Sequence, residues 1–388
     1  MKQKERLWNK NYIFLIIAEF LVFFNFAMES TTLSQYLVNE GFSISSAGIM
    51  VGAMSIAALL GRPMMGWLCD NLHKKRIFII AVVVYAATVF GYTIFVSYYA
   101  FILLRIVHGL SFGIVTTLIM ILLGENIPKE RLGEGMGIAS IASSLAFTVG
   151  PNLAINIGNY YKYSYIFYVA TLCALGAGII VCFIPYEYQN IKKDKLQIKI
   201  RDLVEKRAVI YAIIICISSA VCGVSNSFVT IYGNDFAVKD IGWYFTVGSI
   251  FAVISKYVSG KISDKFGYLS AVIPEIILTI VSLIILGNIT NKYALFMFII
   301  ATILLNLGTA GLDPVLQAKV LSSVSDKRKG AAASTFYIGA DLGQAIGPII
   351  GGALIQLGGY GNMYLAFIVP LAAILFSLLF IMKIKKNA

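Results

Sequence analysis

The sequence predicts an all-α membrane protein with twelve transmembrane helices in two six-helix bundles, and its composition is the first reason. Of its 388 residues, 59% are hydrophobic and only 13% are charged, and the mean hydropathy is +0.83. Soluble proteins carry about 25% charged residues. The low charge therefore argues against a soluble enzyme, a disordered protein and a nucleic-acid-binding protein, despite a net charge of +12.

Twelve apolar runs are the second reason, because each is long enough to cross a bilayer, which takes roughly 20 residues. Only helices or closed barrels satisfy the backbone in lipid, and apolar runs without alternation favour helices. The first run follows a basic start without an evident cleavage site, so we expect no cleaved signal peptide. The predicted helices are 11–37, 46–69, 77–95, 98–122, 134–157, 163–184, 207–233, 241–263, 269–288, 292–317, 330–356 and 361–383.

An internal repeat is the third reason. A basic segment, 186–206, forms a predicted cytoplasmic linker between a first bundle, 1–185, and a second bundle, 207–388. Gly66 and Asp70 recur as Gly260 and Asp264 after 194 residues, and Gly150-Pro151 recurs as Gly347-Pro348 after 197 residues. Such a parallel repeat of six helices is typical of a transporter with its binding site between the halves.

The basic residues predict the orientation of the chain. When Lys and Arg are assigned to alternate sides of the twelve helices, 25 of the 31 fall on the side of the amino terminus. Lys162, Lys239 and Lys292 fall on the other side, and three more lie within spans. Because cytoplasmic loops are enriched in Lys and Arg, both termini are predicted in the cytoplasm of a cell membrane, and a bacterial source is expected.

Two loop motifs, after the second and the eighth predicted helices, share a pattern of glycine, aspartate and basic residues. The first reads Gly66-x-x-x-Asp70-x-x-x-Lys74-Lys75-Arg76, with Asn71 and His73 in place of a basic residue and a glycine. Its copy reads Gly260-x-x-x-Asp264-Lys265-x-Gly267. Arg105-x-x-His108-Gly109 resembles the signature of the fourth helix, with His108 where glutamine is common. The whole chain thus resembles the major facilitator superfamily, which implies transport by alternating access.

The fifth predicted helix carries part of the antiporter signature of that family. The glycine pattern of the signature is matched at Gly137 and at Gly150-Pro151, whereas Ala146 and Ala154-Ile155 replace other glycines. The resemblance therefore favours the bacterial drug–proton antiporter subgroup with an incomplete motif.

Polar stripes mark the helices that line the central cavity in the resembled fold, namely the first, fourth, seventh and tenth. Steps of three and four residues place such side chains on one helix face. The alternative role of any one stripe is polar contact between helices. The predicted cavity residues are Asn25, Thr32, Tyr36, Thr116, Asn226, Thr230, Asn306, Thr309 and Asp313.

Glu29 and Arg105 are the predicted centre of proton coupling. At 1.5 Å per residue, both lie roughly 11 Å below the outer surface, so an ion pair between the first and fourth helices is plausible. An ionisable residue within a spanning helix is a functional candidate. We expect Glu29 to take up and release the coupled proton, and the alternative is a static salt bridge.

Three further ionisable residues carry open alternatives. His108, one turn from Arg105, could relay protons or serve as a plain hydrogen-bonding group. Glu19 could be a second proton site or could extend to the interface. Asp341 could carry a proton or could pair with Arg62, which would lock the halves. Glu275 lies on a helix that faces lipid in the resembled fold, and it is interpreted as interfacial.

The loop motifs have a mechanical interpretation. Gly66 and Gly260 allow close helix contacts, and Asp70 and Asp264 can sit at the amino end of a helix of the other half, where the helix dipole favours negative charge. Gly150-Pro151 and Gly347-Pro348 are predicted to bend their helices. The predicted gating and helix-contact residues are Arg62, Gly66, Asp70, Lys74, Lys75, Arg76, Lys256, Gly260, Asp264, Lys265, Gly150, Pro151, Gly347 and Pro348.

The sequence therefore predicts a proton-driven exporter of small amphipathic molecules. A phosphate-binding loop and protease or esterase motifs are absent, so we expect neither an enzyme nor a cofactor or metal. The expected partners are a small-molecule substrate, protons and the lipid bilayer, with no nucleic acid, and the expected functional unit is a monomer. Two alternatives stay open: a proton symporter that imports a nutrient, and a membrane receptor without transport.

Overall fold

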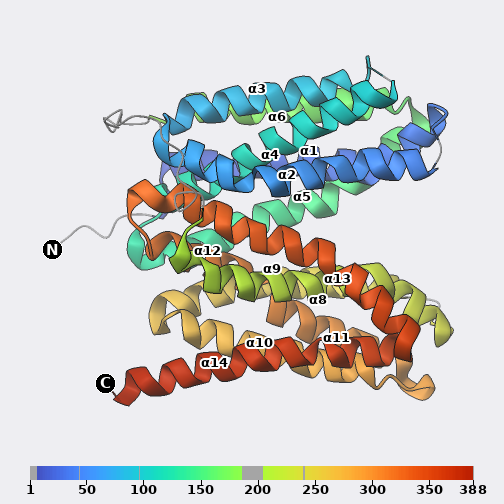
Figure 1. The fold of residues 1–388 in the computed structure, drawn as a ribbon, viewed down its shortest axis with the longest axis vertical. Coiled ribbons are helices and arrows are strands. Elements are labelled where there is room, and N and C mark those ends of the chain that lie inside the picture. The colour runs from blue at the N-terminus through green and yellow to red at the C-terminus, as the bar shows by residue number, and fades with distance from the viewer. Residues whose placement is uncertain (1–6, 43, 96, 186–203, 239–240, 388) are drawn as a thin grey trace. The chain divides into compact units, whose positions relative to one another are not determined.

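The computed structural model describes residues 7–42, 44–95, 97–185, 204–238 and 241–387, and within these ranges the chain consists of helices and connecting turns, without strands (Figure 1). The all-α prediction is therefore confirmed. The predicted linker lies largely outside the described residues, as does Lys239.

The first half of the described chain contains helices that correspond to the first six predicted spans. The side chain of Asn9 caps the first of them by accepting a hydrogen bond of 2.9 Å from the backbone N–H of Tyr12, which satisfies one of the free donors at a helix start. The helices are α1 (Lys10–Asn39), α2 (Ile44–Asn71), α3 (Lys74–Gly91), α4 (Tyr98–Asn126), α5 (Leu132–Tyr160) and α6 (Ser164–Cys182).

The second half is divided differently from the prediction. The predicted span 292–317 is two helices, interrupted at Ala310–Gly311. Pro314 contributes to this interruption, because it has no N–H to donate to the carbonyl of Ala310. The helices are α8 (Lys206–Asp235), α9 (Gly242–Phe266), α10 (Tyr268–Gly287), α11 (Ala294–Thr309), α12 (Leu312–Ser322), α13 (Lys329–Ala366) and α14 (Ile368–Asn387).

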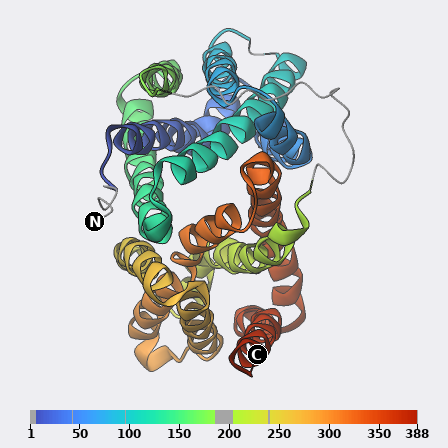
Figure 2. The same cartoon turned by 90° about the vertical axis from the view of Figure 1, so that its left-hand side faces the viewer.

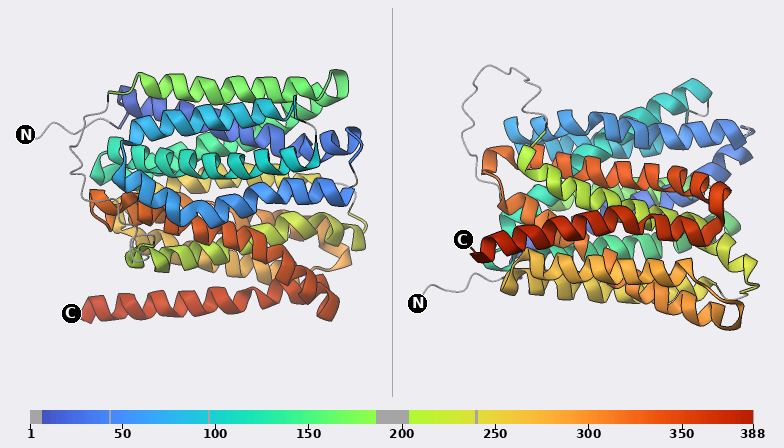
Figure 3. Two further views of the ribbon diagram at one scale, coloured as in Figure 1. Left: turned by 45° about the horizontal axis from the view of Figure 1, so that its top comes forward. Right: turned by 60° about the horizontal axis from the view of Figure 1, so that its bottom comes forward.

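A kink lies at the predicted boundary between the last two helices, 330–356 and 361–383. Gly359 has a φ of 80° inside α13, a conformation that glycine adopts without strain, and the helix resumes after it. The helical chain then continues to Ala366, so the predicted start at 361 falls within α13. Figure 3 shows α14 as a long helix after this point, and it packs beside α10.

Nine stretches of the described chain are long and apolar enough to cross a membrane. Two of them, Asn291–Ser322 and Asp326–Phe380, each include two helices of the structure. The helices α3 and α9 fall outside these stretches. For α9 the reason is visible in the sequence, because its second half carries Lys256, Lys261, Asp264 and Lys265.

The chain forms two compact units, and each unit includes a short segment of the other sequence half. The first unit comprises 1–128, 142–208 and 321–337, and the second comprises 129–141, 209–320 and 338–388. The first turns of α13 therefore belong to the first unit, and the first turns of α5 belong to the second. This exchange places the loop motifs against the helix starts that they contact.

Close helix contacts hold the first unit together. There α2 packs on α4, and α6 packs on both α1 and α3, as the end-on view in Figure 2 also shows. Between α2 and α4, a Cβ added at Gly109 would collide with the carbonyl oxygen of Met54. Because lipid is as apolar as the side chains, helices in a membrane associate through this kind of tight packing rather than through hydrophobic burial.

A methyl group at Gly109 tests this contact. We expect Gly109→Ala to lower the free energy of unfolding by about 1–3 kcal/mol, because the backbone of α2 must move to admit the Cβ. Thermal unfolding in detergent measures the effect. The control is Gly176→Ala on α6, where the added Cβ would lie 3.5 Å from Leu21, an ordinary contact. Equal unfolding midpoints for the two variants would contradict the packing account.

Candidate functional site

A buried ion pair joins α1 to α4 in the first unit. Nη1 of Arg105 donates a hydrogen bond of 2.9 Å to Oε1 of Glu29. Glu29 is fully buried and Arg105 is 2% exposed. The structure therefore brings together the two residues predicted as the centre of proton coupling, and burial makes their mutual attraction strong.

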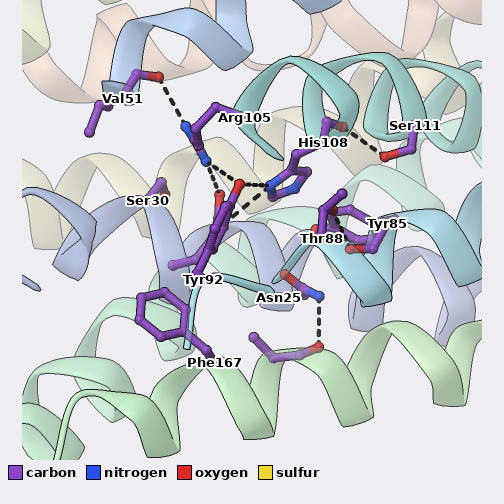
Figure 4. Close-up of polar contacts among 12 residues, drawn as sticks. Asn25, Ser30, Val51, Tyr85, Thr88, Tyr92, Arg105, His108, Ser111 and Phe167 are labelled. Atoms are coloured by element: carbon purple, nitrogen blue, oxygen red, sulfur yellow. Dashed lines mark hydrogen bonds and ion pairs between the residues drawn. The ribbon is translucent and has the colours of Figure 1, made fainter. Parts of the chain in front are cut away.

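The guanidinium of Arg105 has further partners that hold it in place. Its Nε donates to the carbonyl of Met50 at 3.2 Å, and its Nη2 donates to the carbonyl of Val51 at 3.0 Å. Nη1 also reaches the hydroxyl of Tyr92 at 3.3 Å (Figure 4). Arg105 thus connects α2, α4 and the end of α3 to the carboxylate on α1.

His108 completes this network, one turn along α4 from Arg105. Its Nδ1 lies 2.6 Å from the hydroxyl of Tyr92 and 3.5 Å from Oε2 of Glu29 (Figure 4). Which of the tyrosine and the imidazole donates depends on the tautomer of the ring. Oε2 of Glu29 and Nε2 of His108 are buried atoms without a hydrogen-bond partner among the described residues. The site can therefore accept a proton without losing an existing hydrogen bond at these atoms.

The other polar residues predicted on α1 make separate contacts. Asn25 donates to the carbonyl of Ala170 on α6 at 2.6 Å, and Tyr36 donates to the carbonyl of Tyr92 at 2.9 Å (Figure 4 shows Asn25). Thr32 donates to the carbonyl of Met28 in its own helix at 3.1 Å. These bonds join helices or satisfy local groups, which corresponds to the alternative role that the stripe allowed.

Arg62 on α2 forms a second buried arginine site in the first unit. Its Nη1 donates to Oγ1 of Thr116 at 3.1 Å, and its guanidinium lies 4.6 Å from the ring centre of Tyr337. The hydroxyl of Ser334 donates a hydrogen bond to the backbone carbonyl of Arg62. Thr116, which was predicted to line the cavity, thus accepts a hydrogen bond from Arg62. Asp341 belongs to the second unit, and its pairing with Arg62 stays a prediction.

The remaining predicted ionisable and cavity residues are dispersed. Glu19 on α1 is 8% exposed. Asn226 is exposed on α8, and the side chain of Thr230 lies outside the described part of the chain. In the second unit, Asn306 and Thr309 bond to carbonyls one turn back in α11, and Asp313 accepts a hydrogen bond of 3.0 Å from Gln317.

The two loop-motif aspartates each hold the start of a helix. Asp70 accepts hydrogen bonds from the backbone N–H groups of Gly330 and Ala331, at 2.6 Å and 2.9 Å. Asp264 accepts from Gly133 and Glu134 at 2.7 Å and 2.8 Å. Each carboxylate therefore satisfies two free N–H groups and opposes the positive end of the helix dipole.

Glycines allow these aspartates to reach the helix starts. A Cβ added at Gly66 would lie 2.6 Å from the carbonyl oxygen of Gly330, and one added at Gly260 would collide with the carbonyl oxygen of Gly133. Lys256, one turn before Gly260, donates to the carbonyl of Ser140 at 2.9 Å.

The other basic residues of the loop motifs have individual contacts. Lys74 pairs with Glu125 at the end of α4. Lys75 donates to the carbonyls of Cys182 and Ile184 at 2.6 Å and 2.8 Å. Arg76 is exposed, and Lys265 lies 4.9 Å from the ring centre of Phe266.

The two Gly-Pro pairs lie inside continuous helices. Pro151 is in α5 and Pro348 is in α13. A Cβ added at Gly150 would lie 3.0 Å from that of Ala27, and one added at Gly347 would collide with the carbonyl oxygen of Ala220. Both pairs thus lie at close helix contacts, and the expected bends stay a prediction.

Sequence reasoning missed Tyr92 and misplaced Glu275. Tyr92 is fully buried between Arg105 and His108. Tyr92 follows the end of α3 and belongs to no polar stripe on a helix face. Its partners, Arg105 and His108, come from α4. Glu275 is 3% exposed, so its interpretation as interfacial is wrong. Among the described residues, no group of three or more His, Cys, Asp or Glu could hold a metal ion.

The chain is similar to known proteins over nearly its whole length. A family model described as Major Facilitator Superfamily matches residues 15–239 and 211–387. The quinolone resistance protein NorA of Staphylococcus aureus is 24% identical over 96% of both chains. An uncharacterized MFS-type transporter of Methanocaldococcus jannaschii is 22% identical over 92% of this chain and 94% of its own.

Solved structures agree with this chain in fold. The human organic anion transporter MFSD10 has a TM-score of 0.80 at 16% identity, covering 95% of this chain and 99% of its own. The fucose:proton symporter of E. coli also has a TM-score of 0.80, at 12% identity, covering 97% and 99%. These likenesses confirm the predicted fold, a multi-pass membrane protein with twelve helices in two six-helix halves.

A double-mutant cycle tests the buried ion pair. Arg105→Gln alone would leave the Glu29 carboxylate buried without its cation, and we expect a loss of about 3–5 kcal/mol in stability. Glu29→Gln together with Arg105→Gln removes both charges, and it should recover part of that loss. Thermal unfolding in detergent measures each variant, with Arg76→Gln as the exposed control. Losses that simply add would contradict a direct interaction between the two side chains.

Proposed function

Because this chain belongs to the major facilitator superfamily, whose members are transporters and not enzymes, we propose that it exports small amphipathic molecules in exchange for protons by alternating access. The similarity to a quinolone resistance protein supports export of drug-like molecules. The single observation that carries the proton coupling is the fully buried carboxylate of Glu29, paired on one oxygen and open on the other.

The geometry around Glu29 supports reversible protonation. Its Oε1 is held by Arg105, whereas its Oε2 is the oxygen without a hydrogen bond and is therefore the atom that takes the proton. A neutral carboxyl group attracts the guanidinium far less than a carboxylate does. Proton uptake would consequently weaken the contact between α1 and α4.

Arg105 retains partners when Glu29 becomes neutral. The carbonyls of Met50 and Val51 and the hydroxyl of Tyr92 still accept its N–H groups. Arg105 would stay bonded to α2 and to the residue that follows α3 while α1 is released. Protonation would therefore weaken the contact between α1 and α4 without leaving the guanidinium unsatisfied. This asymmetry gives the proton a mechanical effect, which a static salt bridge would lack.

His108 provides a route for the proton or fixes Tyr92. Its Nδ1 lies 2.6 Å from the Tyr92 hydroxyl and 3.5 Å from Oε2 of Glu29, so a ring nitrogen is within reach of the oxygen that would take the proton. A neutral imidazole that only bonds Tyr92 would use the same geometry. The proposal assigns the relay to His108, and the alternative is a positioning role.

An aromatic cluster next to Glu29 along α1 is the proposed substrate contact. The ring centres of Phe26 and Phe112 lie 4.8 Å apart in a stacked arrangement. Phe23 lies 6.1 Å from Phe112, Phe147 lies 6.0 Å from Phe26, and Phe23 and Phe147 lie 5.9 Å from each other. Phe147 is 47% exposed, so the cluster is accessible from one side. Aromatic faces bind lipophilic molecules and attract cations, and a nearby carboxylate would favour cationic substrates.

The proposed setting follows from the charge distribution. We place the chain in a bacterial cell membrane with both termini in the cytoplasm, where its Lys and Arg residues concentrate. The two halves carry one complete set of cavity helices, so the proposed functional unit is the monomer.

Glu29→Gln in liposomes tests the proposed function. The protein is reconstituted in liposomes, and a pH gradient is imposed across their membrane. Lipophilic cations, neutral drugs, sugars and small metabolites are then added one at a time, and the internal pH is recorded. We expect a substrate of the wild type to move protons in the opposite direction, and Glu29→Gln to abolish that movement because it carries no titratable group.

The matched control is Glu40→Gln, the same chemical change at an exposed position after the end of α1, which should transport normally. Protons that move together with substrate would establish a symporter instead. Binding without flux would indicate a receptor, and fully proton-coupled transport by Glu29→Gln would exclude Glu29 as the proton carrier.

A further inference from the structure

The interruption between α11 and α12 lies against a buried carboxylate in the second unit. Helix α11 ends at Thr309 and α12 begins at Leu312. Helix α10 approaches closely here, because a Cβ added at Gly308 would lie 2.7 Å from the backbone nitrogen of Thr279. Glu275, one turn earlier on α10, is 3% exposed. A charged side chain is therefore directed into the protein at a point where the helical backbone of its neighbour is broken.

Three side-chain oxygens converge at this interruption. A Cβ added at Gly311 would lie 2.7 Å from Oγ of Ser255 and closer still to Oγ of Ser259 and Oε1 of Glu275. The two serines come from α9, one turn apart, and they are 3% and 6% exposed. Only a residue without a side chain admits this arrangement, so Gly311 allows the three oxygens to approach the interrupted backbone.

The carboxylate lacks a partner that would neutralise it. The hydroxyl of Ser259 faces Glu275, but neither carboxylate oxygen accepts a hydrogen bond of normal geometry from the described residues. No described basic side chain forms an ion pair with Glu275. The basic side chains on the adjoining elements have other contacts: Lys256 donates to the carbonyl of Ser140, Lys261 pairs with Glu134, Lys265 lies over the ring of Phe266, and Lys319 lies over the ring of Tyr268. An isolated buried carboxylate is costly, so a cation must accompany it or it must be protonated.

The chemistry of the surrounding groups distinguishes these possibilities. Ser255 donates its proton to the carbonyl of Leu307 at 2.8 Å, so the lone pairs of its oxygen remain for another group. Carboxylate, hydroxyl and backbone carbonyl oxygens are the ligands of hard cations. Transporters also coordinate sodium ions with the carbonyls and carboxyl-terminal ends of interrupted helices.

We propose that Glu275, Ser255, Ser259 and the interrupted backbone at Ala310–Gly311 form a binding site for a sodium ion. The ion neutralises Glu275 and joins α9, α10 and the ends of α11 and α12. Its binding therefore orders the interruption in the second unit. This site is separate from Glu29, which lies in the first unit, and it does not depend on the proposed direction of transport.

Sodium binding to the purified full chain tests the site. Thermal unfolding in detergent is followed at constant ionic strength while choline chloride is replaced by sodium chloride, and binding of radioactive sodium is measured in parallel. A ligand that binds only the folded state raises the unfolding midpoint in a saturable way. We expect this rise for the wild type, its loss in Glu275→Gln, and at least a tenfold weaker apparent affinity in Ser259→Ala.

Glu40→Gln is the control and should respond as the wild type does. If Glu275→Gln does not yield folded protein, Ser259→Ala carries the test, because it removes one neutral ligand and leaves the carboxylate in place. The same sodium response in the wild type and in either site variant would overturn the proposal. A wild-type midpoint that changes with pH but not with sodium would also overturn it, since the carboxyl group would then hold a proton instead.

Discussion

The cost of burying a charge is the constraint on which the account of this chain depends. Glu29 and Arg105 are both almost inaccessible to water, and each would be strongly unfavourable alone. Their pairing draws on four helical segments, because Arg105 also holds carbonyls of α2 and the tyrosine that follows α3. A single proton on Glu29 would change the balance of this whole set of contacts, which supports the proposed coupling role of this residue.

The same reasoning applies at the helix ends. Asp70 and Asp264 lie in sequence repeats that are 194 residues apart, and each satisfies two backbone N–H groups at the start of a helix from the other sequence half. These carboxylates need no basic partner because the helix start supplies the opposite partial charge. Breaking these hydrogen bonds would leave unsatisfied donors, so each aspartate stabilises the start of the helix that it contacts.

The sequence predicted features that depend on composition and local spacing. Apolar length identified the spans, and the steps of three and four residues on α1 and α4 identified Glu29, Arg105 and His108. What it could not predict depends on contacts between distant segments. Tyr92 enters the site through the end of another helix, and Glu275 is covered by α9 and α11 although its own helix reads as lipid-facing. A long apolar run predicts one continuous helix, whereas the tenth span is divided at Gly311, close to Pro314.

The most direct test of the central claim is to observe the protonation of Glu29 itself. Infrared difference spectroscopy of the reconstituted protein detects the carbonyl stretch of a protonated carboxyl group when a transported substrate is added. If Glu29 carries the coupled proton, substrate binding removes a proton from a buried carboxyl group. The difference band of that carbonyl stretch should then be absent in Glu29→Gln and present in Glu40→Gln. An identical difference spectrum for the wild type and Glu29→Gln would contradict the claim that Glu29 carries the coupled proton.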